Sequence, residues 1–119
     1  METVLVVDED PLVRRAFRAL LSRAGYRILQ AGDLSVGVAL ARSEAVDLVI
    51  TDLEFGGQPK PEAPSRFQQV RDVPVIAVCA DPGLSERAAR CGIKVLKKPP
   101  DVSQIRAAIA DCLAHREGD

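Results

Sequence analysis

Short apolar runs alternate with amphipathic segments along the whole chain. Four runs are mostly apolar, at residues 3–7, 47–51, 74–79 and 93–96. Such runs are typical of strands that helices cover on both faces, which indicates a parallel sheet. A fifth segment, residues 26–30, alternates polar and apolar side chains and predicts an edge strand.

The segments between these strands carry apolar residues at the 3.6-residue spacing of a helix. Asp10 and Pro11 provide a cap and a first helical residue, and Gly25 ends the first helix. Gly37 weakens the second helix, because glycine has a low helix propensity. Glycines and prolines crowd residues 55–64 and predict a loop, which shortens the third helix. The predicted helices span residues 11–24, 35–43, 65–70, 82–91 and 101–113.

This alternation of strand and helix predicts one α/β domain over residues 1–119. Right-handed connections between parallel strands place helices on both faces of the sheet and give a doubly wound fold. We therefore expect a five-stranded parallel sheet. The length of 119 residues suits one such domain with one sheet.

The composition indicates which classes of binding partner and which cellular compartment to expect. A formal net charge of −1 gives no attraction to nucleic acid or to an anionic membrane, so we expect neither as a partner. No apolar run has the length of a transmembrane helix, and the start lacks the basic leader of a signal peptide. The three cysteines form no paired motif and indicate reduced thiols, hence a cytoplasmic location. They are Cys79, Cys91 and Cys112.

Charged residues directly follow three of the apolar strands. Asp8 and Glu9 follow the first, Asp52 follows the third and Lys98 follows the fifth. The carboxyl ends of parallel strands line one crevice, so we expect these four side chains to meet there. An acidic cluster with one ammonium group suits a small divalent cation and a phosphoryl group.

Four stretches of the chain resemble the receiver domain of bacterial two-component response regulators: VLVVDEDPLVRRAFRALLSRAGY, DLVITDLEF, VPVIAVCAD and CGIKVLKKP. The resemblance covers nearly the whole chain. It implies a sheet of strand order 2-1-3-4-5 and a Mg²⁺-dependent phosphorylation of Asp52. It also implies a histidine kinase or phosphotransfer protein as donor, and a downstream protein or a further output domain as target.

By the same resemblance, Asp8, Glu9, Asp52 and the backbone carbonyl of Glu54 hold the metal, and Lys98 pairs with the phosphoryl group. Mg²⁺ is the expected ion and Mn²⁺ is an alternative. A carboxylate that attacks phosphorus brings two anions together, so the reaction needs nearby cations. The domain would catalyse only its own phosphorylation and dephosphorylation, and we expect no enzyme activity beyond these.

Three features depart from the family pattern. Cys79 stands where Thr or Ser is usual, Val95 stands where an aromatic residue is usual, and EFGGQPKP replaces the turn after the phosphoacceptor. The first two positions form the conformational switch of the family, so we expect atypical switching. One alternative is therefore a pseudo-receiver, which keeps the fold and binds proteins without the switch.

A second alternative is a phosphatase of the haloacid-dehalogenase type, with Asp8 as nucleophile and Asp10 as acid/base. That interpretation leaves Asp52 unexplained, and the chain lacks a paired acidic motif after Lys98. A cap on the first helix is the simpler role for Asp10. The arginines of this helix, including Arg14, indicate a solvated outer face.

Overall fold

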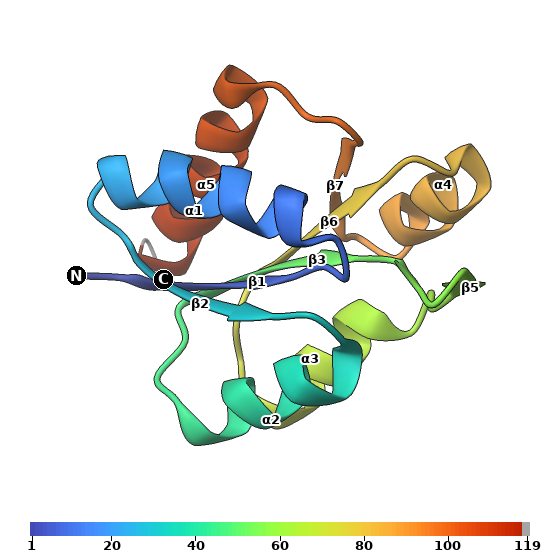
Figure 1. Ribbon diagram of the computed structural model, residues 1–119, viewed down its shortest axis with the longest axis horizontal. Helices are drawn as coiled ribbons and strands as arrows, with labels where there is room; N and C mark the ends of the chain where they lie inside the picture. The colour runs from blue at the N-terminus through green and yellow to red at the C-terminus, as the bar shows by residue number, and fades with distance from the viewer. Residues whose placement is uncertain (118–119) are drawn as a thin grey trace.

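Five parallel strands form the central sheet of the computed structural model, which describes residues 1–117 with side chains as far as Ala114 (Figure 1). The strands are β1 (Thr3–Val7), β2 (Arg27–Ala31), β3 (Leu48–Asp52), β6 (Val75–Cys79) and β7 (Lys94–Lys97). Their order is β2-β1-β3-β6-β7, with parallel pairing throughout. The predicted doubly wound fold and its strand order 2-1-3-4-5 are therefore confirmed.

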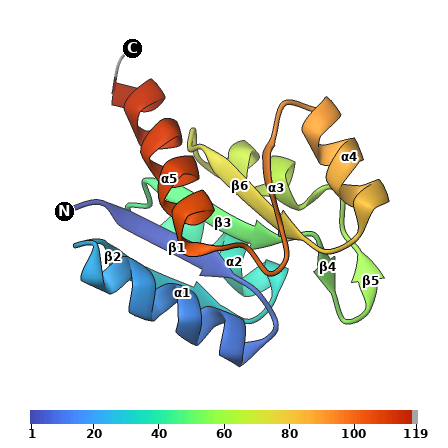
Figure 2. The same cartoon turned by 90° about the horizontal axis from the view of Figure 1, so that it is seen from above.

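Helices cover both faces of this sheet. One layer contains α1 (Pro11–Arg23) and α5 (Val102–Glu117), which lie above the sheet in Figure 1. The other contains α2 (Leu34–Ser43) and α3 (Ala63–Val70), and α4 (Pro82–Arg90) extends it along β6 and β7 (Figure 2).

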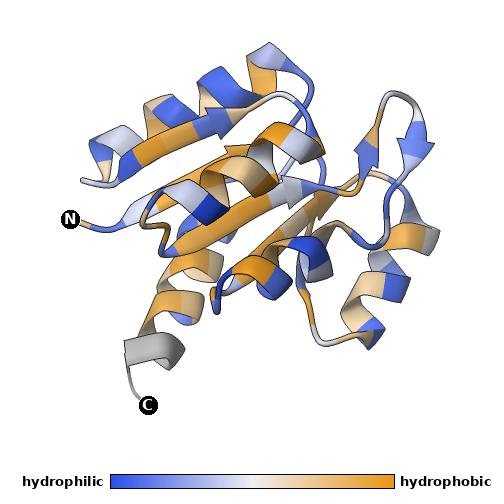
Figure 3. Cartoon of the chain, turned by 90° about the horizontal axis from the view of Figure 1, so that it is seen from below, coloured by the Kyte–Doolittle hydropathy of each residue, from blue (hydrophilic) through white to orange (hydrophobic). Residues whose placement is uncertain are grey.

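Two apolar cores separate the sheet from the two helical layers. Successive side chains of a strand point to opposite faces, so Val4 and Val6 pack with α1 and α5 while Leu5 and Val7 pack with α2 and α3. Each of these four residues is at most 1% exposed. The strands of the central sheet are accordingly mostly hydrophobic, whereas hydrophobic and hydrophilic residues are interspersed along the helices (Figure 3).

Gly37 has a packing role that helix propensity does not reveal. A Cβ atom at this position would lie 2.9 Å from a methyl carbon of Val7 and 3.2 Å from the ring of Phe67. Glycine therefore lets α2 approach β1 and α3 closely, which outweighs its weak propensity in the helix.

The segment predicted as a loop at residues 55–64 contains a small antiparallel hairpin. Strand β4 (Glu54–Phe55) pairs with β5 (Gln58–Pro59), and Gly56 and Gly57 form the turn between them. Both glycines have positive φ angles, of 61° and 73°, as the tight turn of a two-residue hairpin requires. The loop prediction is wrong here, because Gly-Gly between two strand residues is itself a hairpin signal.

The other predicted boundaries differ by a few residues. Helix α3 begins at Ala63 rather than at residue 65, and with 8 residues it is the shortest of the described helices. Strands β2, β3, β6 and β7 each begin one residue later than predicted, and α5 continues to Glu117.

Candidate functional site

The carboxyl ends of β1, β3 and β7 bring three charged side chains together. Asp8 follows β1, Asp52 is the last residue of β3, and Lys98 follows β7. The Nζ atom of Lys98 donates hydrogen bonds to Oδ2 of Asp8 at 2.7 Å and to Oδ2 of Asp52 at 3.0 Å. The parallel sheet causes this convergence, because its strands present their carboxyl ends at one edge.

Both carboxylates are buried, and their other oxygens are bonded to backbone amides. The side chain of Asp8 is 4% exposed and that of Asp52 is 9% exposed. Oδ1 of Asp52 accepts hydrogen bonds from the N–H groups of Leu53 at 2.7 Å and Glu54 at 3.1 Å. Oδ1 of Asp8 accepts one from the N–H of Asp10 at 2.9 Å. These bonds fix the orientation of both carboxylates toward the ammonium group.

The ammonium group of Lys98 is held firmly in its charged form. Its backbone N–H donates to the carbonyl of Cys79 at 3.1 Å, which fixes the start of the side chain. Burial lowers the pKa of Lys98, but the hydrogen bonds and negative charges of Asp8 and Asp52 outweigh burial and raise it above the ordinary 10.5. The positive charge therefore offsets part of the repulsion between the two carboxylates at neutral pH.

Glu9 is exposed, and its carboxylate is bonded to the hairpin rather than to Lys98. Its Oε2 atom accepts a hydrogen bond of 2.7 Å from the N–H of Gly56. Within the described part of the chain, no three His, Cys, Asp or Glu side chains converge as a metal-binding group. The structure therefore brings Asp8 and Asp52 together and holds Glu9 at the hairpin turn.

The backbone carbonyl of Glu54 lies in the first strand of the hairpin. Lys60 donates its N–H to the carbonyl of Leu53 at 2.6 Å, so these two residues form a hydrogen-bonded pair. The next pair, Glu54 and Pro59, is then non-hydrogen-bonded, and the polar backbone groups of Glu54 point away from the partner strand. The N–H of Glu54 donates to Oδ1 of Asp52 at 3.1 Å, which places the backbone of Glu54 next to this carboxylate.

These oxygen atoms suit a hard divalent cation. Mg²⁺ prefers one or two carboxylates with further oxygen ligands, and Asp8, Asp52 and the carbonyl of Glu54 supply that chemistry. Asp8 and Asp52 share one nitrogen of Lys98 within hydrogen-bond distance, so one ion can reach both carboxylates. Two carboxylates face the single ammonium group of Lys98, and the remaining negative charge favours the binding of a cation.

Cys79 and Val95, at the two predicted switch positions, are both part of the packed interior. Cys79 is 1% exposed, and its Sγ donates to the backbone carbonyl of Asp81 at 3.6 Å. Val95 is half-buried and packs against the core beside α4. The thiol is therefore already engaged with the first turn of α4, and Val95 presents a small apolar side chain.

Asp10 and Arg14 show how α1 supports the site. The carboxylate of Asp10 accepts a hydrogen bond from the N–H of Leu12 at 2.9 Å, so the predicted helix cap is confirmed. The predicted solvated position of Arg14 is wrong, because Arg14 is half-buried and its Nη1 donates to the carbonyl of Asp8 at 2.6 Å. Its place three residues before the buried Phe17 was the available signal.

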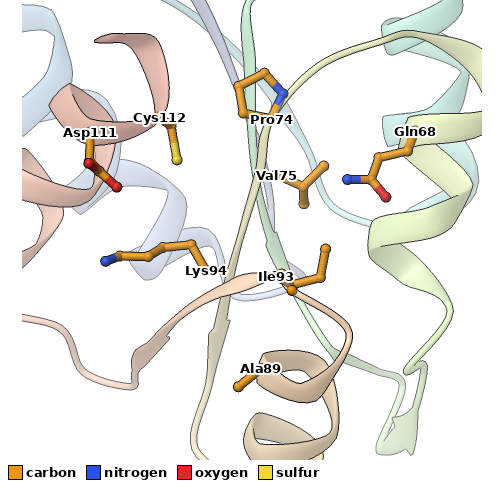
Figure 4. Close-up of a pocket in the computed structure, with 9 residues that line it drawn as sticks. Gln68, Pro74, Val75, Ala89, Ile93, Lys94, Asp111 and Cys112 are labelled. Carbon is orange, nitrogen blue, oxygen red and sulfur yellow. The ribbon is translucent and has the colours of Figure 1, made fainter. Parts of the chain in front are cut away.

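A separate hollow of about 490 Å³ lies at the opposite end of β6 and β7 (Figure 4). Val75 and Ile93 lie between Gln68 of α3 on one side and Cys112 of α5 on the other. Burial, followed by the charge of Asp111, raises the pKa of the Cys112 thiol, which disfavours the reactive thiolate. This hollow is lined by none of the predicted site residues.

Comparisons with known proteins agree on one family. A sequence profile described as response regulator receiver domain matches residues 4–110. Transcriptional regulatory protein GlrR of Escherichia coli (strain K12) is 30% identical over 114 residues, covering 92% of this chain and 26% of that protein. KDP operon transcriptional regulatory protein KdpE of the same strain is 29% identical over 112 residues, covering 92% of this chain and 50% of that protein. The chain thus spans half or less of these relatives.

Solved structures show the same fold. The signal receiver domain of an HD domain-containing protein from Pseudomonas fluorescens Pf-5 has a TM-score of 0.89 and 26% identity, over 99% of this chain and 98% of that one. The response regulator protein TrrA from Thermotoga maritima, solved in complex with Mg²⁺ and BeF, has a TM-score of 0.84 and 23% identity, over 95% of this chain and 100% of that one.

Proposed function

The chain belongs to the response regulator receiver domain family, and from this premise we propose that residues 1–119 act as a receiver that accepts a phosphoryl group on Asp52. The main support is the shared ammonium of Lys98, which contacts two buried carboxylates at the carboxyl edge of the sheet. Asp52 ends a central strand, and its carboxylate is oriented by two backbone N–H groups. A carboxylate held in this way is suited to attack on phosphorus.

In the proposed reaction, a carboxylate oxygen of Asp52 forms a bond to the phosphorus atom of the donor. The bond between phosphorus and the donor breaks, and the donor keeps the electron pair and takes up a proton. Lys98 transfers hydrogen bonds from the carboxylates to the phosphoryl oxygens and so stabilises the negative charge that they carry. Attack by water on phosphorus later breaks the bond to Asp52, which restores the carboxylate and releases inorganic phosphate. We propose no activity on other substrates.

The proposed cofactor is Mg²⁺, with Mn²⁺ as an alternative, and its proposed protein ligands are Asp8, Glu9, Asp52 and the carbonyl of Glu54. When bound, the ion supplies positive charge that offsets the repulsion between the carboxylates and the phosphoryl group. The backbone bonds of Asp8 and Asp52 hold these oxygens in place before any ion binds. The similarity to TrrA, a protein solved with Mg²⁺ and BeF, supports this assignment.

Phosphorylation is proposed to alter the conformation around α4 less than in receivers with Thr and an aromatic residue at the switch positions. A thiol is a weak hydrogen-bond donor, and that of Cys79 is engaged by the carbonyl of Asp81. Val95 has no ring that can move between buried and exposed positions. Cys79→Thr combined with Val95→Tyr should enlarge the amide chemical-shift changes that a phosphoryl mimic causes near α4. An unchanged response would show that these positions do not limit switching.

The proposed phosphoryl donor is a histidine kinase or a phosphotransfer protein. An apolar groove of about 220 Å³ between α1 and α5 reaches Lys98 and offers such a partner a surface beside the site. Phe17 and Ile105 line this groove. Leu12, which is 67% exposed, directly precedes the lining residue Val13 in the sequence. The proposed target of the signal is a downstream protein or a further output domain.

The proposed location is the cytoplasm, where the three free thiols would stay reduced. Among the described helices, none has the length and apolar character needed to cross a bilayer.

The decisive experiment is phosphorylation of the purified chain by acetyl phosphate, followed by intact-protein mass spectrometry. With Mg²⁺, wild type should gain the mass of one phosphoryl group, and chelation of the metal should prevent this. Asp52→Asn should gain none, whereas Asp72→Asn, at an exposed position outside the site, should behave as wild type. An equal adduct on Asp52→Asn would move the phosphoacceptor elsewhere.

The second candidate function is the pseudo-receiver, a binding module without a phosphorylation switch. The bonding of Glu9 to Gly56 and of Cys79 to Asp81 favours it, because both side chains are engaged away from the site. It predicts no adduct on wild type in the same experiment. The phosphatase interpretation loses its acid/base, since the carboxylate of Asp10 caps α1.

A further inference from the structure

The hydrogen bond between Glu9 and Gly56 joins the loop after β1 to the β4–β5 hairpin, across 47 positions of the sequence. A carboxylate acceptor makes this a charge-assisted bond, and its length of 2.7 Å is typical of that class. The same carboxylate stays outside any three-ligand group among the described residues. Glu9 is therefore bonded to the hairpin, whereas the proposed reaction needs it as a ligand of the metal.

We propose that this hydrogen bond is a latch, in which the hairpin turn withholds Glu9 from the divalent cation. The inference rests on the proposed function, because it assigns Glu9 to the metal. When a cation is bound, the carboxylate of Glu9 would leave the N–H of Gly56 and join the ion, and the hairpin turn would be released. Phe55 stays anchored, since it is 8% exposed and belongs to the apolar core, so the release is confined to the turn.

Thermodynamic linkage gives the size of the effect. If the latch is closed most of the time, the apparent dissociation constant of the metal rises by the inverse of the open fraction. A hydrogen bond of typical net strength at an exposed position lowers the open fraction by roughly three- to tenfold. By reciprocity, metal binding must in turn shift the hairpin toward the open state.

Gly57 offers a way to open the turn without touching the metal ligands. Its φ angle is 73°, and a Cβ atom built there would meet nothing within 4 Å. A substitution at this position therefore acts through the backbone conformation alone. Valine disfavours a positive φ because it is β-branched, whereas asparagine tolerates it. Gly57→Val should open the turn, and Gly57→Asn is the matched control.

The test is a Mg²⁺ titration of the full chain labelled with ¹⁵N, followed by amide chemical shifts and amide exchange rates. Gly57→Val should bind Mg²⁺ roughly three- to tenfold more tightly than wild type, and Gly57→Asn should bind within about twofold. In wild type, the amide proton of Gly56 should move upfield and exchange faster as the metal saturates. Equal affinities in all three proteins, or a Gly56 amide that stays protected with metal bound, would overturn the latch.

The outcomes separate the latch from the proposed function. If Mg²⁺ shifts the signals of Asp8 and Asp52 but leaves Gly56 unchanged, the latch is wrong and the proposed metal site stands. If Mg²⁺ shifts no signal in any variant, both proposals fall. If Gly57→Val loses its dispersed spectrum, the Gly56 amide of wild type decides the matter, because that readout needs no substitution.

Discussion

Replacement of Lys98 by methionine tests the electrostatic account of the site. The side chains of Asp8 and Asp52 are 4% and 9% exposed, and both carboxylates bond to the Nζ atom of Lys98. Loss of one partner from a buried ion pair costs about 3–5 kcal/mol, because a buried charge is left uncompensated. Lys98 itself is 23% exposed, which screens the interaction, so we expect a loss of about 2–3 kcal/mol in the free energy of unfolding.

The assay is urea unfolding at pH 7 in the presence of a chelator. Lys97→Met is the matched control, because Lys97 is adjacent and exposed, and it should change stability by less than about 0.5 kcal/mol. Asp8→Asn in the Lys98→Met background should restore about 1 kcal/mol or more, since it removes one of two like charges. Saturating Mg²⁺ should also restore stability, because an ion that binds only the folded state stabilises it.

The reasoning is refuted if Lys98→Met unfolds at the same urea concentration as Lys97→Met. It is also refuted if the double variant with Asp8→Asn is no more stable than Lys98→Met alone. Either result would mean that the two carboxylates are not held against each other by the fold.

Three further predictions concern pH, packing and thiol reactivity. The pKa of Lys98 is raised in the folded state, so its contribution to the free energy of unfolding is fully present below the ordinary 10.5 and is lost as pH rises through the folded value. Urea unfolding in that pH range should show wild type losing stability relative to Lys98→Met, and parallel curves would contradict this. Gly37→Ala should lower the free energy of unfolding by about 1–2 kcal/mol, because its Cβ would press on Val7, and a raised urea midpoint would show that helix propensity dominates. At pH 8, Cys91 should react with a thiol reagent about tenfold faster than Cys112, because Cys91 is exposed and burial raises the pKa of Cys112; equal rates would contradict the burial argument.

The hydrophobic pattern was enough to predict the strands, the helices and the edge of the sheet where the site lies. Alternation and helical spacing record which face of each segment is buried, and this information is local. A parallel sheet then brings the residues at the carboxyl ends of its strands to one edge, which is why the sequence alone groups Asp8, Asp52 and Lys98. The hairpin at Gly56 and Gly57 was missed although its signal is local, because the neighbouring prolines favoured a loop.

The individual partners of the site residues depended on the tertiary structure. Nothing in the pattern of the chain indicates that Glu9 bonds to Gly56, that Arg14 bonds to the carbonyl of Asp8, or that Gly37 makes room for Val7. Each of these contacts joins two different elements or loops, and a shift of a few tenths of an ångström between them would change it. Periodicity determines which face of a segment turns inward, whereas close packing of the assembled layers determines which atoms meet there.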